Sequence, residues 1–142
     1  MAAVDAIDSY VTGLPALRAR RLGHGEWGLT VPAESLGGEP LDVGLRLADG
    51  LLRAQAVALH GASDLDPWML LWWNRQTRLV RFGCTRSRDL WVHADVPAPG
   101  LAERDVDRLL GLVVEAAVAV RSHAEQVRGA RPEAPPRPDS ST

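Results

Sequence analysis

Apolar and polar residues alternate along residues 41–48, and a period of two is typical of a strand that buries one face. Residues 51–60 are expected to return as its partner strand. Asp49-Gly50 lies between them, and this dipeptide is a strong signal for a two-residue hairpin turn. Residues 27–31 alternate in the same way and predict an earlier strand.

A tryptophan-rich segment follows this hairpin. Asp66 suits the N-cap of a helix and Pro67 suits its first position, so we expect a helix that runs to about Arg75. Asn74 lies near the end of this helix, and Asn tolerates the left-handed conformation in which many helices end. We therefore expect Asn74 to terminate it.

A second hairpin is predicted beyond the helix, with strands over 79–85 and 90–97. Cys84 is the only cysteine, which excludes an internal disulfide. It alternates with Val80 and Phe82 on one face of the first strand. We expect Cys84 to be a small buried residue and not a reactive thiol.

Two segments show helical periodicity, 4–12 near the N-terminus and 103–128 near the C-terminus. The first ends at Gly13, which can cap a helix. Along the second, apolar residues recur at the spacing of three and four that marks one buried face. That face consists of Val106, Leu109, Leu110, Val113, Ala117, Val120 and Ala124.

The expected element order is α-β-β-β-α-β-β-α. Consecutive hairpins with helices between them favour an α+β fold with an antiparallel sheet. A chain of 142 residues suits a single domain, which we place at residues 1–128. Residues 129–142 are polar and rich in proline, which predicts a disordered tail. The pattern over 16–25 predicts no definite element.

Charge and hydropathy change this picture little. The net charge is −2, and a hydrophobic content of 46% is ordinary for a globular protein. No apolar run approaches the roughly 20 residues that cross a bilayer. The N-terminus has neither the basic nor the apolar region of a signal peptide. We expect a cytoplasmic protein that does not bind membranes.

Side chains capable of catalysis are scattered along the chain. The histidines His24, His60, His93 and His123 have no partner at a metal-ligand spacing, and no serine lies in a GxSxG elbow. His93 and Asp95 share one strand face, where a solvated polar pair is the simplest interpretation. We therefore expect no catalytic residue, no metal, no cofactor and no enzymatic activity.

Basic residues cluster in one segment that has no acid between Asp66 and Asp89. Beside tryptophans, such a strip can follow a phosphate backbone, so single-stranded nucleic-acid binding is the alternative function. The simpler interpretation is an exposed face whose arginines pair with Asp42, Asp49 or distant glutamates. This arginine strip consists of Arg75, Arg78, Arg81, Arg86 and Arg88.

Several of these segments together resemble the YbjN-like family of bacterial sensory transduction regulators, which shares its fold with type III secretion chaperones. They are the hairpin around Asp49-Gly50, the helix ending Leu70-Leu-Trp-Trp-Asn74, the strand Leu79-Val-Arg-Phe82 and the segment 90–97. The resemblance extends in element order over about residues 4–128. It implies a non-enzymatic, homodimeric chaperone-like or regulatory adaptor that binds a segment of a partner protein, in stress or sensory regulation. The sequence identifies neither the partner nor the surface that binds it.

The tryptophan-rich helix has more apolar surface than one sheet can cover. At 100° per residue its apolar side chains span an arc of roughly 200°, whereas packing on a sheet needs about 100°. The C-terminal helix could cover the excess, but a second copy related by a two-fold axis is the preferred cover. The predicted dimer interface is Trp68, Leu71 and Trp72, whereas Met69, Leu70 and Trp73 would face the sheet.

Overall fold

The structure is a computed structural model that describes residues 2–36 and 38–130. Its centre is a six-stranded antiparallel sheet with the strand order β1-β2-β3-β4-β6-β5. The elements are α1 (Ala2–Thr12), η1 (Pro15–Leu17), β1 (Arg20–Gly23), β2 (Glu26–Val31), η2 (Ala33–Ser35), β3 (Leu41–Ala48), β4 (Leu51–Leu59), α2 (Pro67–Gln76), β5 (Arg81–Cys84), β6 (Leu90–Pro97) and α3 (Glu103–Gly129).

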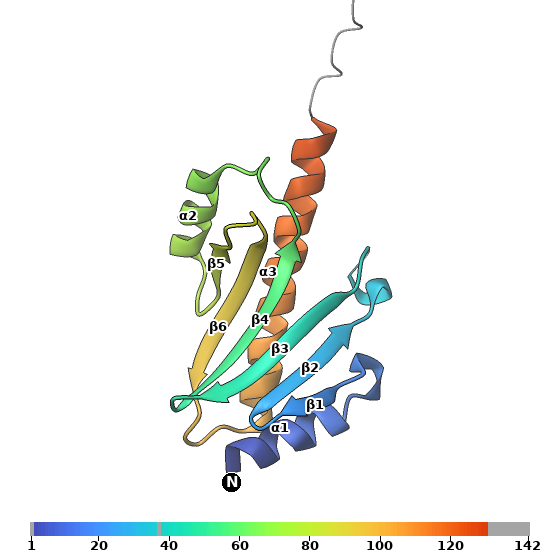
Figure 1. The fold of residues 1–142 in the computed structure, drawn as a ribbon, viewed down its shortest axis with the longest axis vertical. Coiled ribbons are helices and arrows are strands. Elements are labelled where there is room, and N and C mark those ends of the chain that lie inside the picture. The colour runs from blue at the N-terminus through green and yellow to red at the C-terminus, as the bar shows by residue number, and fades with distance from the viewer. Residues whose placement is uncertain (1, 37, 131–142) are drawn as a thin grey trace, which may run out of the picture.

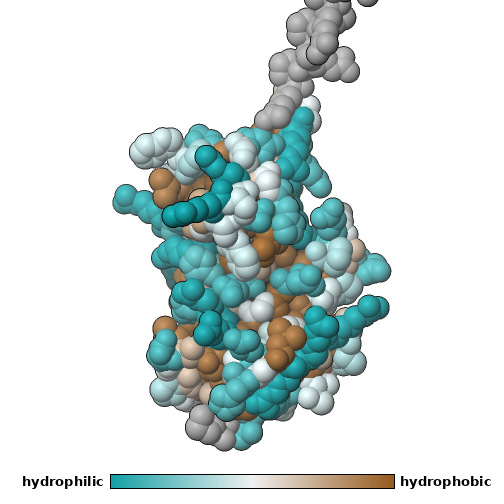
Figure 2. All heavy atoms as spheres, in the orientation of Figure 1, coloured by the Kyte–Doolittle hydropathy of each residue, from teal (hydrophilic) through white to brown (hydrophobic). Residues whose placement is uncertain are grey.

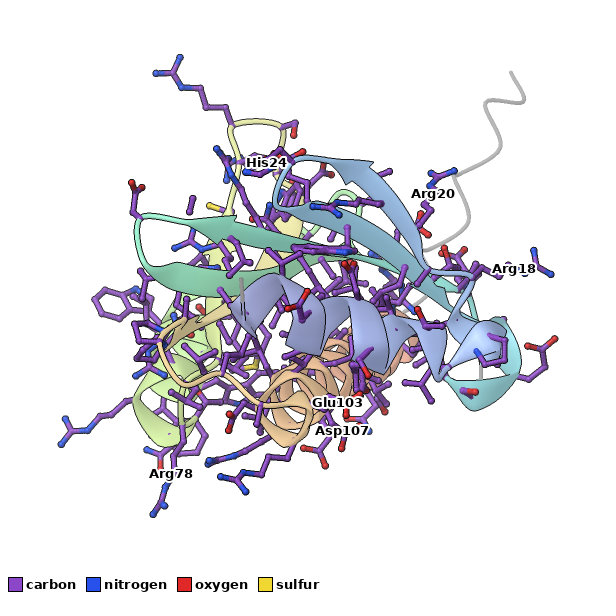
Figure 3. The ribbon with its side chains drawn as sticks, turned by 90° about the horizontal axis from the view of Figure 1, so that it is seen from below. Arg18, Arg20, His24, Arg78, Glu103 and Asp107 are labelled. Carbon is purple, nitrogen blue, oxygen red and sulfur yellow. The ribbon has the colours of Figure 1, made fainter. Side chains whose placement is uncertain are left out.

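The three α-helices lie on one side of the sheet, and no helix of the described residues covers the opposite face (Figure 1). Figure 3 shows this layering from below, with α1 and α3 on one side of the strands and Arg20 and His24 on the other. The predicted α+β class with an antiparallel sheet is confirmed. The order of the predicted elements is also confirmed, with one additional strand.

The additional strand is β1, which lies within the segment where the sequence predicts no definite element. It pairs with β2 through Arg20 and Arg21, and a register shift follows before Gly23. All four of its residues are exposed, so burial imposes no alternation on them. Because alternation is the signal that reveals a strand in a sequence, this edge strand leaves none.

The long helix α3 supplies the main cover of the sheet. All seven residues of its predicted apolar face are buried, as are the inward-facing residues of β2 and β4 and all but Leu47 of those of β3. Trp27 is the largest fully buried side chain, and its indole nitrogen donates a hydrogen bond to the Asp8 carboxylate of α1 at 2.8 Å. Tyr10 of α1 donates another to Asp107 of α3 at 2.7 Å. These two bonds fasten α1 to the sheet and to α3.

The predicted turn at Asp49-Gly50 joins β3 to β4. Both residues have positive φ, 53° and 75°, which is the geometry of a type I′ hairpin turn. Gly129 ends α3, and the rest of the predicted tail lies outside the described residues from position 131 onward. Within the described chain, no helix combines the length and the apolar character that crossing a membrane requires.

Candidate protein-binding surfaces

The short helix α2 begins as its sequence predicts. The Asp66 carboxylate accepts a hydrogen bond from the Trp68 backbone N–H at 3.0 Å, and Pro67 occupies the first helical position. None of the residues of α2 is buried. A helix of ten residues is marginal by itself, so its few contacts with the rest of the molecule hold it in place.

One side of α2 faces the molecule. Trp73 lies against Phe82 of β5, with ring centroids 5.9 Å apart. It also meets His123 of α3 edge to face at 5.4 Å. Leu70 packs against the hydrophobic core of the domain. The prediction that Leu70 and Trp73 face inward is therefore confirmed, and Met69 is half-buried beside them.

The other side of α2 is apolar and open. The exposed fractions are 78% for Trp68, 58% for Leu71 and 61% for Trp72. These are the three predicted interface residues, which we call the α2 patch. The interpretation that the C-terminal helix covers them is wrong, because all three side chains stay exposed although α3 is described over its full length. The dimer interface itself stays a prediction.

Asn74 does not end α2, which continues to Gln76. Its amide nitrogen donates to the Phe82 carbonyl at 3.1 Å, and its amide oxygen accepts from the Phe82 N–H at 2.7 Å. The side chain thus mimics the backbone of a neighbouring strand along the outer edge of β5. The predicted capping role is wrong, because the Asn74 carboxamide bonds to Phe82 and Thr77 is the C-cap of α2.

The arginine strip is divided among the last turn of α2, the start of β5 and the turn after β5. Arg78 and Arg81 lie where the chain enters β5, whereas Arg86 and Arg88 lie in the turn at the opposite end of that strand. Arg81 donates to the Thr77 and Val80 carbonyls, so it serves the local loop. The interpretation that the strip pairs with acids is also wrong, because none of its five guanidinium groups has an acidic partner among the described residues.

Cys84 is exposed, contrary to the prediction. It is the last residue of β5, the outermost strand, and pairs with Leu90 on its inner side only. The apolar face that buries Val80 and Phe82 ends before it. Cys84 does alternate with Val80 and Phe82, but alternation in a sequence does not show at which residue the apolar layer that covers a strand ends.

Polar side chains of β4 and β6 lie next to one another on the uncovered face of the sheet. Arg53 makes a two-pronged contact with Asp95 at 2.8 and 2.9 Å, and these hydrogen bonds lower the pKa of Asp95. Burial lowers the pKa of His93, and the charge of Arg53 lowers it further. Asp95 therefore pairs with Arg53 across the strands, and His93 lies beside this pair. Such partly exposed pairs contribute little to stability.

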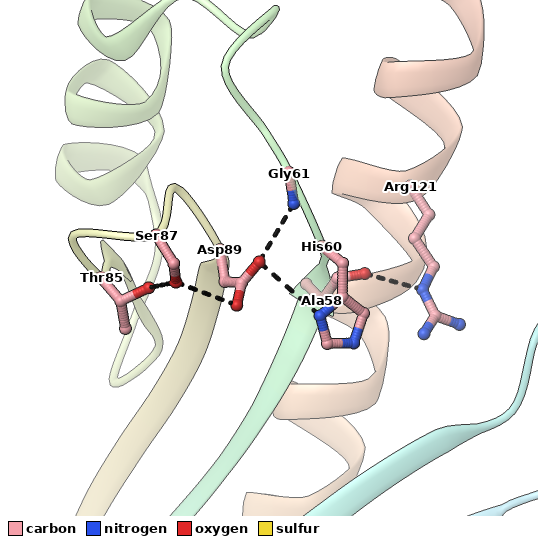
Figure 4. Close-up of polar contacts among 7 residues, drawn as sticks. All are labelled: Ala58, His60, Gly61, Thr85, Ser87, Asp89 and Arg121. Carbon is pink, nitrogen blue, oxygen red and sulfur yellow. Dashed lines mark hydrogen bonds and ion pairs between the residues drawn. The ribbon is translucent and has the colours of Figure 1, made fainter.

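One hydroxyl-rich cluster joins the end of β4 to the turn between β5 and β6 (Figure 4). Asp89 accepts from the Gly61 N–H at 3.1 Å and from the Ser87 hydroxyl at 3.2 Å, and His60 lies 3.6 Å away. Catalytic triads place the histidine between the nucleophile and the acid. Here Asp89 is in the middle, so the cluster serves to fix the turn.

The four histidines stay apart in the fold. No group of three or more His, Cys, Asp or Glu side chains that could hold a metal occurs among the described residues. The α2 patch and the uncovered sheet face are therefore the surfaces that the structure offers for binding.

Comparisons with known proteins agree with this architecture. The family model YbjN, described as "Putative bacterial sensory transduction regulator", matches residues 67–126, from the start of α2 to near the end of α3. The predicted resemblance is thereby confirmed over those residues. A comparison with curated protein sequences gave no significant match.

Two solved structures share the fold. One is the Yersinia pestis type III secretion chaperone SycH in complex with a stable fragment of YscM2, with a TM-score of 0.61 at 17% identity, covering 82% of this chain and 98% of that chain. The other is the HopA1–SchA chaperone–effector complex, with a TM-score of 0.66 at 14% identity, covering 83% of this chain and 91% of that chain. At these identities the likeness establishes the chaperone-like fold alone.

Proposed function

We propose that the protein is a non-enzymatic, homodimeric adaptor of the cytoplasm that binds a segment of a partner protein, in the manner of a chaperone or regulator. The α2 patch is the observation that carries this proposal. Large apolar side chains that stay exposed and contiguous mark interaction sites in proteins. The shared fold adds support, because one similar structure is a chaperone in complex with a stable fragment of YscM2 and the other is a chaperone–effector complex.

A second copy of the chain is the proposed cover of the α2 patch. Each tryptophan can bury about 200 Å², worth on the order of 5 kcal/mol before association costs are subtracted. A two-fold axis doubles this contribution, and clustered tryptophans of this kind form the energetic centre of many interfaces. Partner segments would then bind to surfaces that the dimer leaves open.

Sedimentation velocity of the wild type at tens of micromolar, on the order of a typical load, should show a dimer. Trp72→Asp should give a folded monomer, because it places a charge in the centre of the patch. If that variant does not fold, Trp72→Ser removes the ring without adding charge. Ser9→Asp is the matched control, since it adds the same charge at an exposed helical position in α1, far from α2. A monomeric wild type would contradict the dimer.

Partner binding is tested by cross-linking in the source cells followed by purification of the wild type and of Trp72→Asp. One dominant protein recovered with the wild type, and a direct complex reconstituted from purified components, is the expected outcome. The nucleic-acid alternative predicts tight binding to unstructured oligonucleotides at physiological salt, with a steep loss of affinity as salt increases. Such binding without any protein partner would contradict the proposed adaptor role.

A further inference from the structure

The uncovered face of the sheet contains a groove that no element of the described chain fills. Its volume is about 670 Å³. Gly28 of β2 and Gly44 of β3 form its floor, where they pair directly across the two strands. Figure 2 shows hydrophobic surface along the middle of this face, bordered by hydrophilic side chains.

The fold does not require a glycine at position 44. The φ of Gly44 lies outside the left-handed region, and a Cβ atom there would meet its nearest neighbour, Gln55 Cγ, at 3.9 Å. Gly28 is more constrained, since a Cβ would approach Leu22 Cδ1 to 3.1 Å. Glycine is unfavourable inside a strand and often marks a place where a ligand or another backbone approaches closely. Gly44 therefore keeps space free in front of the sheet.

Side chains enclose this space on all four sides. Along the strands, the Glu26–Arg46 ion pair lies on one side and the Thr30–Asp42 hydrogen bond on the other, at 3.7 and 2.7 Å. Across the strands, Leu22 and Gln55 flank the two glycines. Leu22 is 57% exposed, and Val57 and Trp91 also line the groove. Leu22 lies over Gly28, so the open part of the groove floor is the space over Gly44.

The charges that line the groove are unequal. Three arginines face two acids, and His60 at the margin pairs with Asp89. Arg121 is held by the carbonyls of Ala58, Glu39 and Pro40, so its charge meets no carboxylate. The other groove arginines, Arg18 and Arg20, are exposed and have no acidic partner in the described part of the chain. The groove acids are Glu39 and Asp42.

We propose that this groove binds an extended acidic segment of a partner protein, which places an apolar side chain over Gly44, beside Leu22, and a carboxylate beside Arg20. The inference rests on the proposed function and assigns a surface and a chemistry to the partner. An apolar side chain would contact the glycine backbone and Leu22, while the excess of arginine selects an acidic neighbour. The α2 patch remains free for the second copy.

The probe is a synthetic peptide of about ten residues with a central tryptophan flanked by aspartates, a length typical of extended recognition segments. It is titrated into the isotope-labelled full-length protein and followed by NMR. The backbone amides of Gly28 and Gly44 and the indole N–H of Trp91 should shift. The Trp91 N–H is a suitable reporter because it is buried and has no acceptor among the described residues.

Gly44→Val fills the hollow and should weaken this binding about tenfold or more, in the range of central interface positions. The fold should persist, since valine is favoured in strands and the space for it is open. Gly83→Val is the matched control. Gly83 belongs to β5 and lies on the same face of the sheet as Gly44 but outside the groove, and a Cβ there meets His93 Cε1 at an ordinary 3.6 Å. The control should bind within about twofold of the wild type. Arg20→Glu should weaken binding as Gly44→Val does.

Each remaining outcome overturns the inference. Equal binding of a peptide with lysines in place of the aspartates would contradict the preference for an acidic segment. Undiminished affinity of Gly44→Val, or no shift with the wild type, would remove the groove as the site. In either case, a partner captured in the cross-linking experiment above would leave the proposed function standing. A change of oligomeric state in Gly44→Val would assign the groove to a second copy instead.

Discussion

The helices α2 and α3 lie on the same side of the sheet but use their apolar residues in opposite ways. Seven residues of α3 are buried, and most of its charged residues are exposed. No residue of α2 is buried, and Trp68, Leu71 and Trp72 stay open. When the rest of the protein covers the whole apolar face of a helix, that face stabilises the fold. When the apolar face is wider than the surface that covers it, the remainder is available to bind another molecule. The contrast separates a helix that stabilises the monomer from one that presents a binding surface.

The attachment of the two helices differs in the same way. Along most of its length, α3 contacts β4 and β6 through aliphatic side chains. In contrast, α2 is held at one end of the sheet by Asn74, Trp73 and Leu70. Substitutions in α3 should therefore affect the free energy of unfolding of the whole domain. Substitutions on the outer side of α2 should affect association.

The largest expected effect is the loss of a core side chain from α3. Leu109 is 1% exposed, so Leu109→Ala should lower the free energy of unfolding by about 2–5 kcal/mol. Trp68→Ala removes a larger side chain from α2 but should cost less than about 0.5 kcal/mol, because that ring is exposed. Urea denaturation at a protein concentration below the dimer dissociation constant measures both. A similar cost for the two variants would break the contrast between the helices.

The sequence predicts α3 well because its buried face repeats over many turns, and every residue of that face is buried as expected. The strands β3 and β4 are predicted equally well, since each buries one face and exposes the other. The open side of α2 follows from the width of its apolar arc. In each case the feature follows from the pattern of residues that are close together in the sequence.

The failures concern long-range relations. Asn74 and Phe82 are eight positions apart, and nothing in the sequence indicates that a carboxamide will pair with a strand edge. The exposure of Cys84 depends on where the helical layer ends, and the separation of the arginines depends on the direction of β5. The groove requires the register that places Gly28 opposite Gly44. The signal in the sequence was the presence of glycines within alternating strands.

A middle-sized effect should follow from the link between α2 and β5. Asn74→Ala leaves the N–H and C=O of Phe82 without partners at a half-buried edge, which should cost about 1–3 kcal/mol. Hydrogen exchange of the Phe82 amide should accelerate more than that of amides in β3. Asn74→Asp retains only the acceptor and should lie between the wild type and Asn74→Ala. Unchanged exchange at Phe82 would show that the carboxamide does not hold this edge.

The smallest effect is expected where the two helices touch. His123 of α3 meets Trp73 of α2 edge to face, and such aromatic pairs contribute about 0.5–1.5 kcal/mol beyond the area they bury. His123→Ala should therefore lower the free energy of unfolding by about this amount and shift the NMR signals of α2 more than those of the sheet. His123→Phe keeps a ring at this position and should restore most of the loss, while Ser122→Ala, at an exposed neighbouring position, should be neutral within about 0.5 kcal/mol. If His123→Ala is neutral as well, α2 is held by β5 alone, and the two helices are independent in stability as well as in use.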